Sequence, residues 1–180
     1  MTDALFNDLD RFVRSINAVR PSKIRIEADE VTYSLHIMLR FELEIALLED
    51  KVKVKDLPEV WNAKMQEYLG VTPPDDAHGV LQDVHWSAGT FGYFPTYALG
   101  TFFSVQLYEQ VRKDLPDLET RFAQGDFKTL LTWLRDNLHR HGRKYTLDEL
   151  AKRMTGESLQ TRSFVAYLRN KYSDIYRLGV

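Results

Sequence analysis

Apolar side chains recur at intervals of three and four residues along most of the chain, and this spacing constrains the fold more than any other feature. In residues 3–19 the recurring positions are Leu5, Phe6, Leu9, Phe12, Val13 and Ile16. A second run over residues 24–48 continues the pattern through Ala28, Val31, Leu35, Met38, Leu39 and Ala46. This period places the residues on one face of an α-helix, whereas a half-buried strand would need strict alternation. We find no alternating segment, so the sequence predicts an all-α protein.

Capping residues and helix breakers divide the rest of the sequence into further helices. Asp56, Pro58 and Gly70 suit the start, the first turn and the end of a helix over residues 57–69. Thr146 and Glu149 have the spacing of a capping box at the start of another helix. The other expected helices run to about residue 113 and over residues 118–124, 127–141, 146–154 and 161–177. No repeat or low-complexity linker interrupts them, so we expect one helical domain over residues 1–180.

Composition excludes several classes of function. The chain has no cysteine, which rules out a disulfide framework, a thiol nucleophile and any cysteine-ligated metal. The formal net charge of -2 argues against a nucleic-acid-binding surface. No apolar stretch approaches the roughly 18 residues of a membrane-spanning helix, and the opening MTDALFNDLDRF lacks the features of a signal peptide. We therefore expect a cytoplasmic protein with no membrane or nucleic-acid partner.

The histidines show no metal-binding pattern. The five are His36, His78, His85, His139 and His141, and none belongs to a His-Glu-x-x-His pair. On a helix, His139 and His141 would point roughly 200° apart, and their basic neighbours favour a solvated helix end. Glu27, Glu30 and His36 could in principle form a carboxylate-rich site, but Glu30 and His36 are six residues apart and would fall on different faces of one predicted helix. We expect no metal site in this chain.

Arg25 and Asp29 allow two interpretations. Four residues apart on a predicted helix, they could form an ordinary exposed ion pair, which stabilises a helix by about 0.3–0.5 kcal/mol. Alternatively, neighbouring carboxylates could hold the Arg25 guanidinium rigid, so that its fork of N–H groups binds the carboxylate of a substrate.

The strongest local signal lies in residues 79–100, GVLQDVHWSAGTFGYFPTYALG. Its glycines and proline cannot form one uninterrupted helix. The polar and aromatic side chains that follow one another here are Gln82, Asp83, His85, Trp86, Tyr93 and Tyr97. A histidine beside a carboxylate and phenol groups suits hydrogen bonding to a developing oxyanion. Packing of aromatic side chains in a core would give the same residue types.

Two segments resemble motifs of a single enzyme family. Residues 24–29, IRIEAD, resemble the Ile/Val-Arg-x-x-Ala-Asp motif of the Taq-type metallocarboxypeptidases. Residues 79–86, GVLQDVHW, resemble that family's Gly-x-x-Gln-Asp-x-His-Trp motif, with GYFPTY downstream at 92–97. The resemblance extends from about residue 12 to residue 176. It implies a mostly helical zinc enzyme that removes C-terminal residues from peptides.

The resemblance covers only the C-terminal portion of the family pattern. The upstream His-Pro-Phe and Asp-x-Arg-x-Thr motifs have no counterpart in this sequence. The same holds for the His-Glu-x-x-His helix, which supplies two zinc ligands and the general base, and for the His-Glu-Ser-Gln-like motif with its glutamate ligand. Zinc is therefore implied as the cofactor, but its ligands are not in this chain, and we expect the chain to be inactive alone.

The resemblance also implies a role for each matching residue. Arg25 would bind the terminal carboxylate of the substrate, with Asp29 orienting it. His85 would line the cleft near the scissile carbonyl, and Tyr93 or Tyr97 would stabilise the tetrahedral intermediate. The supporting residues would be Gln82, Asp83 and Trp86.

Two functions follow as alternatives. The chain could be the C-terminal part of a metallocarboxypeptidase, either truncated or completed by a partner chain that carries the zinc helix. It could instead be a helical interaction module that has lost catalysis. If the chain is a truncated enzyme, we expect apolar residues of the 24–48 and 79–99 segments to be exposed, because the elements that would face them across the cleft are missing. We further expect homodimerisation, or repacking, to hide them.

Overall fold

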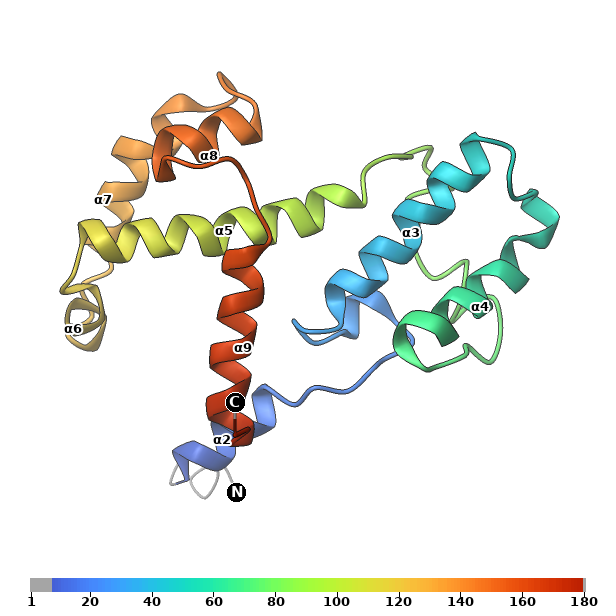
Figure 1. The fold of residues 1–180 in the computed structure, drawn as a ribbon, viewed down its shortest axis with the longest axis horizontal. Coiled ribbons are helices and arrows are strands. Elements are labelled where there is room, and N and C mark those ends of the chain that lie inside the picture. The colour runs from blue at the N-terminus through green and yellow to red at the C-terminus, as the bar shows by residue number, and fades with distance from the viewer. Residues whose placement is uncertain (1–7, 180) are drawn as a thin grey trace. The chain divides into compact units, whose positions relative to one another are not determined.

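A computed structural model describes residues 8–179, and every regular element in this range is a helix (Figure 1). The all-α prediction is therefore confirmed. The chain divides into two compact units, one comprising residues up to 98 together with those from 171, the other residues 99–170. The single domain expected over residues 1–180 stays a prediction. Among the described residues, no helix is long and apolar enough to cross a bilayer.

The first unit contains most of the chain's N-terminal half. Its elements are α2 (Leu9–Ile16), the 3₁₀ turn η1 (Arg25–Glu27), α3 (Tyr33–Leu48), η2 (Val54–Asp56) and α4 (Leu57–Leu69). Helices α3 and α4 pack side by side (Figure 1). Their shared core contains Leu39 and Leu43 from α3 and Trp61 and Met65 from α4, all almost fully buried. This core fixes the position of α3, which carries much of the candidate site.

The helix predicted over residues 24–48 is shorter than expected and begins at Tyr33. The reason lies at Asp29, whose carboxylate accepts hydrogen bonds from the backbone N–H groups of Val31 (2.9 Å) and Thr32 (3.0 Å). Such a side chain competes with the helical hydrogen-bond pattern and favours a turn. In the helix predicted over residues 3–19, the described part is helical only at Leu9–Ile16, and residues 3–7 lie outside the described range.

Helix α4 matches its predicted bounds, Leu57–Leu69. Pro58 lies in its first turn, and Asp56 occupies the position before the helix, although its side chain makes no capping hydrogen bond there. Gly70 ends the helix with a φ of 67°, a left-handed conformation that side chains with a Cβ rarely adopt.

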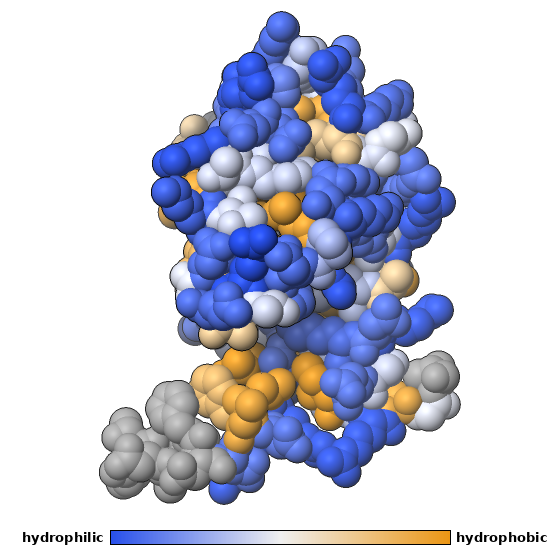
Figure 2. Space-filling view, turned by 90° about the vertical axis from the view of Figure 1, so that its left-hand side faces the viewer, coloured by the Kyte–Doolittle hydropathy of each residue, from blue (hydrophilic) through white to orange (hydrophobic). Residues whose placement is uncertain are grey.

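The second unit is built on α5 and the helices that follow it. Its elements are α5 (Pro95–Asp114) from residue 99 on, α6 (Leu118–Ala123), α7 (Lys128–Asn137), η3 (His139–His141), α8 (Leu147–Thr155) and α9 (Arg162–Tyr176) up to residue 170. Phe103, Leu107 and Val111, four residues apart on α5, form its core with Leu118 and Ala151. Most residues over α6, α7 and α8 are hydrophilic on the face seen in Figure 2. The helix predicted over residues 127–141 ends earlier, because a 3₁₀ turn replaces its last residues.

The predicted capping box at α8 is present and gives a first testable expectation. The Thr146 hydroxyl accepts from the backbone N–H of Glu149, and the Glu149 carboxylate accepts from the backbone N–H of Thr146 at 2.8 Å. Thr146→Ala should lower the free energy of unfolding by about 1 kcal/mol, measured by urea denaturation. Thr132→Ala, at an exposed position within α7, is the control and should change it by less than about 0.5 kcal/mol. Equal effects of the two substitutions would contradict a capping role.

Candidate active site

The candidate site residues predicted from the sequence all lie in the first unit, whereas the His139–His141 turn lies in the second. Arg25 lies on η1, and Tyr97 lies in the first turns of α5. The segment between α4 and α5 has no helix, which confirms that the glycine-rich stretch breaks the helical pattern. Gly89 and Gly92 have φ values of 72° and 78°, so the path of this segment depends on glycine at both positions.

Asp83 lies between two arginines at the centre of the site. Its carboxylate accepts hydrogen bonds from Arg25 (Nη2 to Oδ1, 2.7 Å) and from Arg40 (Nε to Oδ2, 2.6 Å). Arg25 is only 6% exposed and Arg40 is fully buried. Two guanidinium groups share one carboxylate, so the cluster has one surplus positive charge. We call Arg25, Arg40 and Asp83 the arginine–aspartate cluster.

Burial and pairing act in opposite directions on the charges of this cluster. Burial tends to raise the pKa of Asp83, but the hydrogen bond from Arg25 and the charges of both arginines lower it below its ordinary value. Burial lowers the pKa of Arg40 to about 10, against the opposing effect of Asp83. All three groups are therefore charged at neutral pH.

Gln82 connects the cluster to the surrounding backbone. Its side-chain oxygen accepts from the Arg25 backbone N–H (2.9 Å) and from Arg40 Nη2 (2.8 Å). Its amide nitrogen donates to the carbonyls of Lys23, His78 and Gly79. Both polar atoms of the Gln82 side chain therefore have hydrogen-bond partners, as a residue that supports Arg25 and Arg40 requires.

The carboxylate that contacts Arg25 is that of Asp83 rather than that of Asp29. The oxygens of Asp29 accept from backbone N–H groups, including that of Arg20 at 2.9 Å, and from the Thr32 hydroxyl. The helical ion pair considered for Arg25 and Asp29 is not what the structure shows, because the residues between them are not α-helical. Asp29 shapes the turn that places Arg25.

His85 lies beside the cluster and within an aromatic group. Its Nε2 is 3.0 Å from the Tyr97 hydroxyl, and its Nδ1 is 3.9 Å from Asp83 Oδ1 without a hydrogen-bond partner. The ring of Phe94 lies 4.3 Å from the imidazole, centroid to centroid, and that of Tyr93 lies 5.9 Å away. The structure therefore brings His85, Tyr93 and Tyr97 together, with Tyr93 the most exposed of the three.

The aromatic group also covers the guanidinium of Arg25. The Arg25 carbon Cζ lies 5.0 Å from the centroid of the Tyr97 ring and 5.7 Å from that of Phe94. Arg25 Nη1 donates to the Tyr33 hydroxyl at 2.8 Å. These contacts and Asp83 use three of the five N–H groups of Arg25, and two remain for another acceptor.

Glu44 is a site residue that the sequence analysis missed. One of its carboxylate oxygens accepts from the Trp86 indole N–H (2.9 Å), and the other accepts from the backbone N–H of Gly92 (3.1 Å). These partners flank the loop between His85 and Tyr93, so a single carboxylate ties both ends of that loop to α3. Glu44 is 2% exposed.

Arg40 is a second residue of the candidate site that the sequence did not reveal. Both are charged residues on α3, four positions apart, and therefore lie on one face of the helix. That face also carries Leu43 and Leu39 of the core. Charged residues in register with core leucines are the signal that would have identified both as buried residues of the candidate site.

His36 is fully buried next to the cluster, and neither of its ring nitrogens has a hydrogen-bond partner. Burial, followed by the charges of Arg40 and Arg25, lowers the pKa of His36 to about 4, while Asp83 and Asp29 oppose this shift. The neutral imidazole is therefore the form that the folded protein accommodates.

This burial predicts a loss of stability in mild acid. The unfolded chain takes up the His36 proton near pH 6.5 and the folded chain only near pH 4, so stability falls as the pH decreases through this interval. The expected loss is about 3 kcal/mol, measured by urea denaturation at a series of pH values. A His36→Gln variant should lack this slope. Loss confined to pH values below 4 would point to Asp83 instead, since the pKa of that group is lowered.

The residues described here do not form a metal site. Within residues 8–179 no group of three or more histidine, aspartate or glutamate side chains is placed to hold an ion. Glu30 is bonded to Tyr172 (Oη to Oε1, 2.9 Å) and to Lys171. His139 and His141 lie on η3 in the second unit. A zinc site with three protein ligands does not fit the donor set of this part of the chain.

Comparison with known proteins identifies the family. The pattern of the family described as "Carboxypeptidase Taq (M32) metallopeptidase" matches residues 2–172. The chain therefore belongs to the Taq family of metallocarboxypeptidases.

Individual relatives agree with this assignment. The chain is 49% identical over 170 residues to Carboxypeptidase 1 of Bacillus subtilis and 48% identical over 168 residues to Thermostable carboxypeptidase 1 of Thermus thermophilus. A crystal structure of the M32 carboxypeptidase from Deinococcus radiodurans R1 superimposes with a TM-score of 0.89 at 43% identity, over 94% of this chain and 34% of that one. The chain spans about a third of the length of the curated relatives it matches.

Proposed function

We propose that this chain is the substrate-positioning part of a metallocarboxypeptidase that removes C-terminal residues from peptides. In this proposal the chain is inactive alone and acts when polypeptide bearing the zinc ligands completes the site. The observation that carries the proposal is the surplus positive charge of the arginine–aspartate cluster beside the His85–Tyr97 pair. The chain's membership of a metallopeptidase family supports it.

The cluster suits recognition of a peptide carboxylate. Arg25 is held by Asp83 and Tyr33, so binding an anion would cost little further side-chain entropy. Its two remaining N–H groups and the surplus charge favour an acceptor that is anionic. Asp29 contributes by shaping the turn before α3, and Gln82 by joining Arg25 to Arg40.

His85, Tyr93 and Tyr97 suit a supporting role in the reaction. Their N–H and O–H groups are concentrated beside Arg25 and are of the kind that stabilise a developing oxyanion. Trp86 is fixed by its hydrogen bond to Glu44 and so holds the chain next to His85. These groups bind, orient and donate hydrogen bonds, and none of them generates a nucleophile.

Zinc is the metal that we propose for the completed enzyme, with its ligands outside the residues described here. When bound, it would supply the activated water of a metallopeptidase. We place the enzyme in the cytoplasm, since a chain without cysteine does not depend on an oxidising compartment.

Carboxylate recognition can be tested on the chain alone. An N-blocked dipeptide with a free C-terminal carboxylate should perturb the NMR signals of Arg25 Nε–H and the Trp86 indole N–H in a saturable manner. The same dipeptide as a C-terminal amide is the matched control and should bind at least 10-fold more weakly. Equal binding of the two ligands would contradict the proposed role of the cluster.

A substitution at Arg25 tests the same carboxylate recognition from the side of the protein. Arg25→Lys keeps the charge but loses the planar fork, so the dissociation constant of the carboxylate ligand should rise by about 10-fold or more. Circular dichroism would verify that the variant is folded. Arg20→Lys, at an exposed position of the same unit, should leave the constant unchanged.

Metal content completes the test. After dialysis against trace zinc, mass spectrometry of the chain alone should find no stoichiometric metal, and the blocked dipeptide should not be hydrolysed. Stoichiometric zinc with turnover would mean that this chain assembles its own metal site, which would contradict the proposal.

A further inference from the structure

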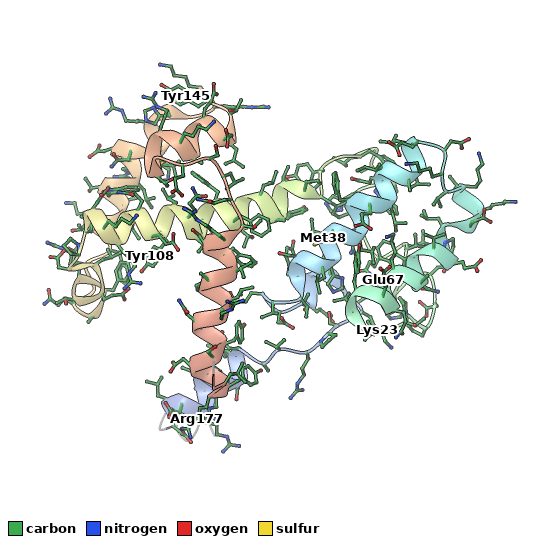
Figure 3. The ribbon with its side chains drawn as sticks, viewed as in Figure 1. Lys23, Met38, Glu67, Tyr108, Tyr145 and Arg177 are labelled. Carbon is green, nitrogen blue, oxygen red and sulfur yellow. The ribbon has the colours of Figure 1, made fainter. Side chains whose placement is uncertain are left out.

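Helix α3 has charged residues inside and large apolar residues outside. Arg40 and Glu44 are 0% and 2% exposed. On the face opposite the core residue Leu43, four apolar side chains are between 39% and 73% exposed: Met38, Phe41, Ile45 and Leu48. We call these four residues the outer α3 face. Met38, near its start, is labelled in Figure 3.

The spacing of these residues makes the outer α3 face a continuous stripe. At about 100° per residue the four side chains lie within about 80° of one another, opposite the core residue Leu43. The only other α3 residue in this sector is Ser34, so the sector contains no charge. A surface helix ordinarily presents polar side chains to water, and a helix that is apolar all round is normally buried on all sides. The expectation that apolar residues of the 24–48 segment are exposed is thus confirmed.

The outer α3 face adjoins the candidate site. Phe41 and Leu48 lie three and four positions from Glu44, so they are its neighbours on the helix surface. Glu44 in turn holds Trp86, and the ring of Phe91, 43% exposed, stacks on Trp86 at 6.0 Å. Polypeptide seated on the outer α3 face would therefore lie next to the loop that carries His85.

The family comparison indicates what this polypeptide is. The matching relatives are about three times longer than the part this chain covers, so two thirds of each has no counterpart here. We propose that the outer α3 face docks polypeptide equivalent to those two thirds, and that this contact completes the site. The inference rests on the proposed function, because it names the surface through which the zinc-bearing part reaches His85.

The test uses the 180-residue chain and a defined partner. The partner is the part of Bacillus subtilis Carboxypeptidase 1 that this chain does not match, co-expressed with the tagged chain. Size-exclusion chromatography with light scattering should show a 1:1 complex. Phe41→Glu and Ile45→Glu should each reduce the recovered complex by at least 10-fold, since each buries a charge in the contact.

A matched control separates docking from general loss of solubility or fold. Val54→Glu adds the same charge at another exposed apolar residue of this unit, 77% exposed and outside α3. It should leave the yield of the complex unchanged. Thermal denaturation of each variant without the partner should give melting temperatures within a few degrees of the parent chain, because all three positions are exposed.

The possible results distinguish the docking surface from the proposed function. A complex that forms equally well with Ile45→Glu would overturn the docking surface. The docking surface would also be overturned if the chain formed a dimer that Ile45→Glu abolishes and did not capture the partner. The outer α3 face would then join two copies of this chain. A complex that depends on α3, binds zinc and does not hydrolyse the dipeptide would support docking and contradict the proposed function.

Discussion

Replacing Asp83 by asparagine should lower the free energy of unfolding by about 3–5 kcal/mol, because two buried guanidinium groups would lose their only shared anion. An asparagine side chain has nearly the same shape, so the loss would come from charge rather than from packing. The surplus of one positive charge would become a surplus of two, in a place that water reaches poorly. The Coulomb repulsion between Arg25 and Arg40, which Asp83 now offsets, would then act without compensation.

Urea denaturation at pH 7, followed by circular dichroism, measures this effect. Glu49→Gln is the control, since Glu49 forms an ion pair with Lys51 in the same unit but both side chains are more than half exposed. Its expected cost is less than about 0.5 kcal/mol. If Asp83→Asn proved as mild as the control, the arginines would have to be solvated, and the buried cluster as described would be wrong.

Local signals in the sequence were sufficient to predict the end of α4 and the start of α8. Gly70 ends α4 at the predicted residue, and Thr146 with Glu149 begins α8 as the capping box requires. Both signals act within four residues, so no knowledge of the tertiary structure is needed. The predicted start of the helix over residues 24–48 was wrong. The apolar pattern continues on both sides of the turn at Asp29, but the turn itself interrupts the helix.

The partners of the site residues were harder to predict because they are distant in sequence. Arg25 has one carboxylate four positions away and another 58 positions away, and the spacing of residues favours the nearer one. The structure joins Arg25 to the distant residue, Asp83, because the 79–94 segment packs against α3. A helical period cannot reveal such a contact.

The buried charges of α3 were missed for a related reason. Charged residues within an amphipathic pattern are ordinarily taken as its solvent face. In α3 the outer face is apolar, and the charges point towards the site segment. An interior that includes Arg40 and Glu44 is stable only because distant residues supply their partners.

Glu44→Gln should destabilise the chain by about 2 kcal/mol and release the loop between His85 and Tyr93. A carboxylate can accept from both the Trp86 indole and the backbone N–H of Gly92, whereas a glutamine has only one oxygen. The NH₂ group of the glutamine would face one of these two N–H donors. That donor would then be buried without an acceptor, at a cost of about 1–3 kcal/mol.

Amide hydrogen exchange locates this effect. Exchange at Gly92 should accelerate by at least 10-fold, since each 1.4 kcal/mol lost locally corresponds to a factor of ten in the opening equilibrium. Glu42→Gln is the matched control on the same helix, because Glu42 binds Lys64 and Tyr68 at the surface and has no link to the loop. If Gly92 remained protected in Glu44→Gln, the loop would be held by its aromatic contacts instead. The position of His85 would then depend on Phe94 rather than on α3.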